Sequence, residues 1–379
     1  MMKVSQAILF ELNNVGVINM YSEEEPYERG AKPYPSLPAA GIYLTICYSA
    51  TIGAMPSPFQ DPNGIFMDLF KSYMPDGPKP SALSFAKVFL APLILGLVVV
   101  AFWINIIFFG LGDRSFKRDV VEGATNPRSV KEAIEEKKEE MGSWTTYTKL
   151  ATVLIIVSIF VIVTRRPMIF DGWYDVLKRK PCGVSVASIA MTIVFFAVPA
   201  NYLFCRYYMC TEPSKVGAAP SCLGWKTVNA NTPWGSIFFL AAALASVYSG
   251  IHSKFYTLLI DTFVRNGIDK AACFWYGSLV GMILTILSPA TALAKYVIPG
   301  MFLAGYKLES GPGALAVPFA AALHNQFMLP CSTPANTIIA GWGNLRPYQF
   351  LLGGIVPTIC YNDSSYNGNN FTLWPVKPT

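Results

Sequence analysis

The stretch Met328–Gly343, MLPCSTPANTIIAGWG, sets small polar residues and two prolines inside an apolar part of the chain. Ser332 and Thr333 supply hydroxyl groups, Asn336 supplies an amide, and the prolines interrupt any helix that runs through them. Carbonyl and hydroxyl oxygens of an unwound segment suit an alkali cation, whereas hydroxyls and backbone N–H groups suit a carboxylate. Two interpretations stay open: a surface loop between two buried helices, or a membrane helix that unwinds to hold a ligand.

The composition is that of a membrane protein. Of the 379 residues, 53% are hydrophobic and only 14% are charged, against about 25% charged residues in ordinary soluble domains. The mean hydropathy is +0.40. Several apolar runs approach the roughly 20 residues that a helix needs to cross a bilayer: Ser84–Gly110, Ser143–Thr164, Gly183–Cys205 and Thr232–Ile251. The fold class that we predict is all-α, a polytopic helical membrane protein.

Charge and residue usage exclude several other classes. The net charge of +6 suits anionic lipid headgroups, and no array of basic and aromatic residues indicates nucleic-acid binding. The chain has only two histidines and shows no pairing of a nucleophile with a base, so we expect neither an enzyme nor a catalytic metal. No cofactor is expected.

Two apolar segments in different halves of the chain are too short or too interrupted to span by themselves. Gly41–Pro56 is too short to cross and ends in the turn MPSPFQDPNG, near residue 60. Pro289 divides another segment into Ala271–Ser288 and Ala290–Ala304, which predicts a re-entrant hairpin over about 271–305.

The stretch Met328–Gly343 contains a second break of the same kind as the turn near residue 60. Gly313–Leu329 precedes it and Thr337–Ile359 follows it, with LPCSTPANTI between them near residue 333. Interrupted segments in corresponding positions of two halves indicate a transporter built from repeats, with its site at the breaks. Non-helical backbone at membrane depth is tolerated only where protein or a water-filled cavity satisfies its polar groups. We therefore expect the two breaks to line a binding site. Because Pro330 and Pro334 flank its hydroxyls, we expect Ser332–Asn336 to be non-helical, to lie near the membrane midplane and to face Ser288–Thr291.

Phe327–Leu345, FMLPCSTPANTIIAGWGNL, resembles the C-terminal motif FMLPVATPPNAIVFxYGxL of the divalent anion–sodium symporters. Members of that family are sodium-coupled cotransporters of di- and tricarboxylates and of sulfate. Three other stretches match the family in the same order: Ile46–Asn63, Trp225–Ala245 and Leu284–Gly300. The resemblance covers most of the chain.

The resemblance implies an inverted repeat in which two re-entrant hairpins and two broken helices hold sodium and the substrate carboxylates. Matches to the broken helices are Thr51, Ile52, Gly53, Pro62 and Asn63 in the first, and Ser332, Thr333, Pro334 and Asn336 in the second. The substrate contacts that we expect are Thr333, Pro334, Ser288, Thr291 and Ser57. The sodium ligands that we expect are Ser332, Asn336, Ser288, Gly53 and Asn63.

The chain departs from the family pattern at several positions. Pro289 stands at the second hairpin tip where the family has asparagine, and Asp61 stands where a neutral residue is usual. The first residues, MMKVSQAILFEL, resemble the sequence just after the first hairpin tip. The polar residues after Cys360 replace the end of the last span. We therefore expect an incomplete or highly diverged member of the family.

The segments and the resemblance together divide the chain. The regions are 1–40, the end of the first hairpin and a hydrophilic connector; 41–110, a broken helix and the following span; 111–149, a charged cytoplasmic loop; and 143–379, the second repeat, with its broken helix at about 313–359 and a polar tail.

The function that we predict is secondary active transport of di- or tricarboxylates, with sodium as the coupling ion that the resemblance implies. We expect a multi-pass protein of the plasma membrane, in contact with the lipid bilayer, and the resemblance also implies a homodimer. The alternative is a degenerate or truncated membrane paralogue that does not transport and has a structural or partner-binding role.

Overall fold

The structure is a computed structural model that consists of helices. It describes residues 2–14, 16, 18–22, 32–58, 61–75, 82–110, 131–132, 135–136, 138–140, 142–165, 170–177, 184–200, 220–265, 270–308 and 311–365. Within these residues no strand forms, and the only extended pairings are the isolated bridges Tyr21–Pro35 and Pro199–Ser221. The all-α fold class is confirmed. The chain forms two compact units, Met1–Ala133 with Pro233–Thr379, and Ile134–Thr232.

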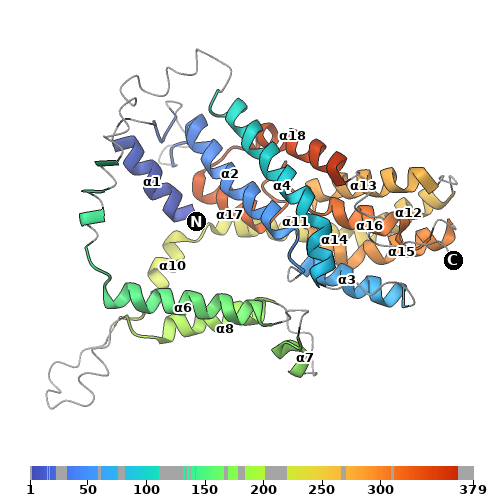
Figure 1. The fold of residues 1–379 in the computed structure, drawn as a ribbon, viewed down its shortest axis with the longest axis horizontal. Coiled ribbons are helices and arrows are strands. Elements are labelled where there is room, and N and C mark those ends of the chain that lie inside the picture. Colours follow the sequence, from blue (N-terminus) through green and yellow to red (C-terminus); the bar gives the residue numbers. More distant parts are fainter. Residues whose placement is uncertain are drawn as a thin grey trace. The chain divides into compact units, whose positions relative to one another are not determined.

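The first unit contains both breaks (Figure 1). Its helices are α1 (Met2–Asn14), α2 (Leu37–Ala54), α3 (Asp61–Tyr73), α4 (Ala82–Ile107), α11 (Trp234–His252), α12 (Phe255–Arg265), α13 (Lys270–Leu287), α14 (Ala290–Tyr296), α15 (Ile298–Lys307), α16 (Gly313–Ala322), α17 (Pro334–Gly343) and α18 (Pro347–Ser365). The helices of the second unit are α6 (Thr146–Val163), α7 (Trp173–Leu177), α8 (Val184–Ala197) and α10 (Trp225–Asn231).

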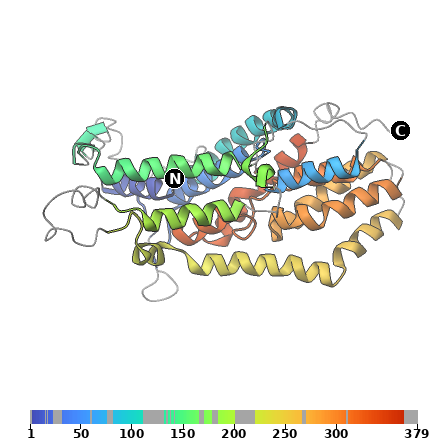
Figure 2. The same cartoon turned by 90° about the horizontal axis from the view of Figure 1, so that it is seen from below.

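Helix α16 lies against α13 and α15 (Figure 2). The approach of α13 is close because two glycines face α16: a Cβ on Gly277 would lie 2.7 Å from the carbonyl oxygen of Leu315, and one on Gly281 would lie 2.7 Å from the Cβ of Ala322. Small residues let membrane helices pack backbone against backbone. This packing fixes α16, and with it the start of the second break.

Helices α2, α4 and α18 form a second group, in which α4 contacts both of the others (Figure 1). The hydroxyl of Tyr48 donates to the carbonyl oxygen of Phe350 at 3.2 Å, and the indole Nε1 of Trp103 donates to that of Leu352 at 2.9 Å. These bonds join α2 and α4 to the same turn of α18. The helix before the first break is thereby held beside the helix that follows α17.

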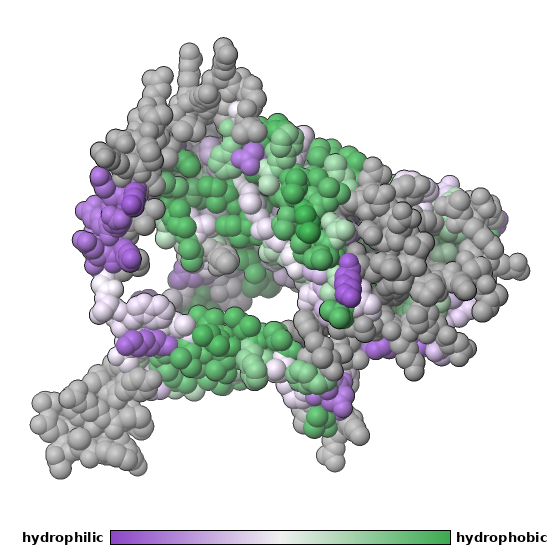
Figure 3. All heavy atoms as spheres, in the orientation of Figure 1, coloured by the Kyte–Doolittle hydropathy of each residue, from purple (hydrophilic) through white to green (hydrophobic). Residues whose placement is uncertain are grey.

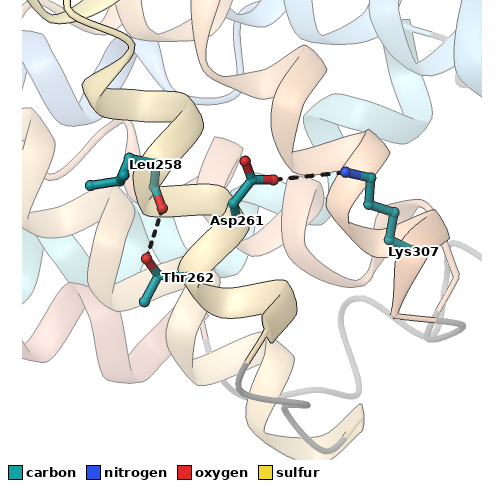
Figure 4. A network of polar contacts seen from close by, with 4 residues as sticks. All are labelled: Leu258, Asp261, Thr262 and Lys307. Carbon is teal, nitrogen blue, oxygen red and sulfur yellow. Dashed lines mark hydrogen bonds and ion pairs between the residues drawn. The ribbon is translucent and has the colours of Figure 1, made fainter.

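A surface ion pair connects α12 with α15. Nζ of Lys307 lies 3.7 Å from Oδ1 of Asp261, and both side chains are more than half exposed (Figure 4). In the next residue of α12, the hydroxyl of Thr262 donates to the carbonyl oxygen of Leu258 at 2.8 Å (Figure 4). Exposed ion pairs of this kind contribute about 0–1 kcal/mol, so the apolar packing of α12 on α15 is the stronger link.

Among the described residues, four helices are long and apolar enough to cross a membrane: Leu37–Ala54, Leu83–Ile107, Thr146–Val163 and Trp234–His252. In the second unit, apolar side chains gather on the surface of the α6–α8 pair, as expected of helices that face lipid (Figure 3). On α6 these include the exposed side chains of Ile155, Ile156, Ile159 and Phe160. Three of the four runs that we predicted as spans are among these helices.

The start of α2 and the end of α8 differ from the predicted boundaries. Gly41–Pro56 is not too short to cross, because α2 starts at Leu37, where Ser36 caps its first turn by accepting from the N–H of Ala39 at 3.3 Å. The third predicted span ends early, since α8 stops at Ala197 and Pro199 pairs with Ser221. Residues 201–205 of that span lie outside the described residues.

The segment after the second break is two helices, where a single one was expected. Asn344 ends α17 in the left-handed conformation, with a φ of 50°, and α18 begins at Pro347. Asparagine tolerates this conformation because its short polar side chain can bond locally. The predicted stretch Thr337–Ile359 therefore turns a corner between α17 and α18.

Candidate functional site

The first break lies between α2 and α3. The amide Nδ2 of Asn63, in the first turn of α3, donates to the carbonyl oxygens of Met55 at 3.0 Å and Ser57 at 2.8 Å. These carbonyls belong to the segment that the helices leave unpaired, so the asparagine supplies the donors that the backbone lacks. Asn63 is 4% exposed. Its side chain holds the bend between the two helices.

The second break runs from Leu323 to Thr333, between α16 and α17. We had expected Ser332–Asn336 to be the non-helical part, and this is wrong for Pro334–Asn336, which form the first turn of α17. Proline is favoured at the first position of a helix, and the hydroxyl of Thr333 accepts from the N–H of Asn336 at 2.9 Å as the cap. The unwound backbone lies on the amino-terminal side of Thr333.

Asn336 holds the second break as Asn63 holds the first. Its Nδ2 donates to the carbonyl oxygens of Gln326 at 2.8 Å and Leu329 at 3.0 Å. The hydroxyl of Thr337 adds a bond to the carbonyl oxygen of Pro330 at 2.7 Å. Asn336 is fully buried.

The two breaks meet through the oxygens of the same two asparagines. Nε2 of His324, in the second break, donates to Oδ1 of Asn63 at 2.8 Å. Sγ of Cys47, in α2, donates to Oδ1 of Asn336 at 2.7 Å. Each asparagine thus ties its own break with its nitrogen and contacts the other half of the site with its oxygen. Both oxygens that we expected to bind sodium already have these partners.

The hairpin tip reaches the second break. The hydroxyl of Ser332 donates to the carbonyl oxygen of Ile286 at 2.8 Å, in the last turn of α13. We expected contact with Ser288–Thr291, and the contact falls just before that segment. Ser288 itself is buried and shares a hydrogen bond with Tyr256. The break predicted at Pro289 is observed, because α13 stops at Leu287 and α14 starts at Ala290.

The remaining predicted residues are spread around this centre. Gly53 lies exposed in the last turn of α2, Thr291 lies exposed in the first turn of α14, and Pro334 is exposed at the start of α17. Ser57 takes part through its carbonyl oxygen, which accepts from Asn63. Hydrogen bonds link Asn63 to His324 of the second break, Ser332 to the end of α13 and Thr333 to Asn336. Gly53 and Thr291 take no part in these bonds and are exposed.

Three neighbouring side chains were missed by the sequence reasoning: His324, Asn325 and Gln326. All three are buried, and the ring of His324 also meets the edge of Phe89, with centroids 5.8 Å apart. The signal was available as three consecutive polar residues inside the apolar run AALHNQFML. The prolines and hydroxyl residues a few positions later are the stronger sequence signal of a helix break.

The side chains at this centre are uncharged donors and acceptors. Among the described residues no group of three histidine, cysteine or acidic side chains is placed to hold a metal ion. Hydroxyls, amides and unwound carbonyls bind small ions and oxyanions without covalent chemistry. The arrangement suits reversible binding.

Helices with exposed apolar faces, several of them long enough to span and two of them interrupted, define a multi-pass α-helical membrane protein. Residues 30–362 match the model of the family described as the sodium:sulfate symporter transmembrane region. The chain belongs to this family, which is one of transporters and not of enzymes.

Three relatives illustrate the range of the similarity. The chain is 27% identical to Protein I'm not dead yet of Drosophila melanogaster, over 95% of this chain and 63% of the relative. It is 23% identical to the Na(+)/dicarboxylate cotransporter 3 of Homo sapiens, over 83% of this chain and 53% of the relative. It is 25% identical to solute carrier family 13 member 2 of Rattus norvegicus, over 84% and 56%. The chain thus spans less than two thirds of the length of each.

Proposed function

We propose that this chain carries out secondary active transport of di- or tricarboxylates, coupled to sodium. The observation that carries the proposal is the meeting of two helix breaks through Asn63 and Asn336 inside a chain of the symporter family. Two interrupted helices that touch at their breaks are the arrangement in which such transporters bind their substrate.

The chemistry of the second break supports an anionic substrate. Thr333 and Ser332 place hydroxyls where α17 begins, and the start of a helix carries a partial positive charge. A carboxylate is stabilised there by the hydroxyls and by backbone N–H groups. The names of relatives include a sodium/dicarboxylate cotransporter, and the family model is described by sodium and sulfate. We favour carboxylates over sulfate and treat sulfate as the competitor in the test.

Uptake of radiolabelled succinate, citrate and sulfate by cells that express the full chain tests the proposal. We expect uptake of a carboxylate above that of cells without the chain, lower when choline replaces sodium, and competed poorly by sulfate. Measuring how much of the chain reaches the surface of the same cells tests the proposed plasma-membrane location. Absence of uptake of all three anions, with the chain present at the surface, would support the paralogue that does not transport.

Thr333→Ala sharpens this test at the site. Loss of a hydroxyl that contacts a charged group costs about 1.5–3 kcal/mol, so uptake at low substrate should fall about ten- to a hundredfold. Thr333→Ser keeps the hydroxyl and serves as the matched control. Equal uptake by the alanine variant would limit Thr333 to its role as helix cap.

The variant Pro289→Asn tests whether the hairpin tip contributes to binding of the coupling ion. Pro289 caps α14 without a side-chain hydrogen bond, and an asparagine there would restore the amide that the family resemblance implies. We expect this variant to depend more steeply on sodium than the native chain does. An unchanged sodium dependence would separate the hairpin tip from ion binding.

A further inference from the structure

Asn325 lies where the two breaks meet. The residue before it, His324, bonds to Asn63 of the first break, and the carbonyl oxygen of the residue after it, Gln326, accepts from Asn336. Both neighbours are therefore held by the asparagines that organise the site. The position of Asn325 is fixed from both sides.

Within the described part of the chain, the side chain of Asn325 has no hydrogen-bond partner. It is fully buried, and neither its Nδ2 nor its Oδ1 is bonded to another described residue. Nε2 of Gln326 is also buried and has no partner among the described residues. Native structures pair nearly all such atoms, because an amide left unpaired away from water costs about 1–3 kcal/mol. A buried amide with both ends open has bonding capacity for a ligand or an ordered water molecule.

The free atoms define the chemistry of that ligand. The NH₂ groups of Asn325 and Gln326 donate, which suits the oxygens of a carboxylate. Oδ1 of Asn325 only accepts, so it repels a carboxylate and needs either an O–H or N–H donor or a cation such as sodium. A carboxylate that also bears a hydroxyl satisfies the donor and the acceptor within one molecule, whereas a plain dicarboxylate leaves Oδ1 to a cation or unpaired.

We propose that Asn325 is a specificity residue that accepts a hydrogen bond from the hydroxyl of a hydroxycarboxylate, while its NH₂ and that of Gln326 donate to a carboxylate. This inference rests on the proposed transport of carboxylates and names the substrate class within it. Because Asn325 is sealed from solvent, the segment Leu323–Thr333 has to open for the ligand to enter. Sites built to bond a hydroxyl discriminate strongly against the analogue that lacks it.

L-malate and succinate form the test pair, because they differ by one hydroxyl. The purified full chain is titrated with each in detergent and sodium, and binding is followed by competition against labelled succinate. We expect malate to bind about ten- to a hundredfold more tightly than succinate. In Asn325→Leu, whose side chain has the same number and branching of heavy atoms and no polar atom, this ratio should fall to about one while succinate still binds.

Two further variants keep the test decisive. Asn325→Ala repeats the measurement if the leucine variant does not fold. Asn105→Leu is the matched control, since the side chain of Asn105 is exposed on α4 and its amide donates to the carbonyl oxygen of Ala101 in its own helix. Equal binding of malate and succinate by the native chain, or a ratio unchanged in the Asn325 variants, overturns the inference and leaves carboxylate transport standing. Absence of binding of both acids overturns the inference together with the proposed function.

Discussion

Both helix breaks use an asparagine to pair the backbone carbonyl oxygens that the helices leave without donors. The breaks differ in the number of buried side-chain atoms that remain unpaired. In each, an asparagine in the first turn of the following helix donates to two carbonyl oxygens of the unwound segment. Among the described residues, no buried side-chain nitrogen or oxygen of the first break lacks a partner, whereas in the second break Asn325 and Gln326 have buried atoms without one.

This difference suggests that one break positions the helices and the other binds a ligand. A break in which the backbone and the asparagine satisfy each other serves to position the helices around it. A break that buries additional open donors and acceptors retains bonding capacity for something that enters. We therefore propose that the segment Leu323–Thr333 contributes the larger part of ligand recognition.

The largest expected effect is that of Asn336→Ala. The change leaves the carbonyl oxygens of Gln326 and Leu329 buried without a donor and removes the acceptor of Cys47. We expect the free energy of unfolding to fall by about 3–5 kcal/mol, measured by thermal unfolding of the purified chain in detergent. Asn105→Ala on the exposed face of α4 is the control, and similar melting of both variants would contradict the role of Asn336.

Asn63→Ala should cost somewhat less, about 2–3 kcal/mol, because part of the first break is accessible to solvent. A double-mutant cycle with His324→Leu measures the bond between the breaks. We expect a coupling free energy of about 0.5–3 kcal/mol. Additive effects of the two changes would show that the breaks do not support each other.

Thr333→Ala removes the cap of α17. The N–H of Asn336 loses its side-chain acceptor, so stability should fall by about 1 kcal/mol. Thr333→Ser should recover most of the loss, since serine caps equally well. If serine failed to recover it, the methyl group of Thr333 and not its hydroxyl would be the stabilising part.

The smallest effect is expected outside both breaks. Lys307 and Asp261 are exposed, and Asp261→Asn should change the free energy of unfolding by less than about 0.5 kcal/mol. Thermal unfolding at low and high salt provides the measurement. A loss as large as that of Asn63→Ala would mean that surface charge, and not the asparagines, dominates the stability of this unit.

Much of the fold was predictable from the sequence because bilayer crossing leaves a composition signal. Runs of apolar residues predicted α4, α6 and α11 closely, and prolines marked both breaks and the hairpin tip. Helix ends were less predictable. The start of α2 at Leu37 and the corner at Asn344 depend on a cap and on a left-handed residue, which are local details that hydropathy does not register.

The sequence by itself determined the class of protein, its family and the residues near which the site lies, since Pro, Asn, Ser and Thr inside apolar segments are costly unless they are used. Only the tertiary structure decided the partners. His324 of one break bonds to Asn63 of the other, 261 positions away along the chain, and this pairing leaves Asn325 buried and open. Hydrogen bonds between distant segments depend on how the helices pack, so no local pattern encodes which of several polar side chains is satisfied and which is left for a ligand.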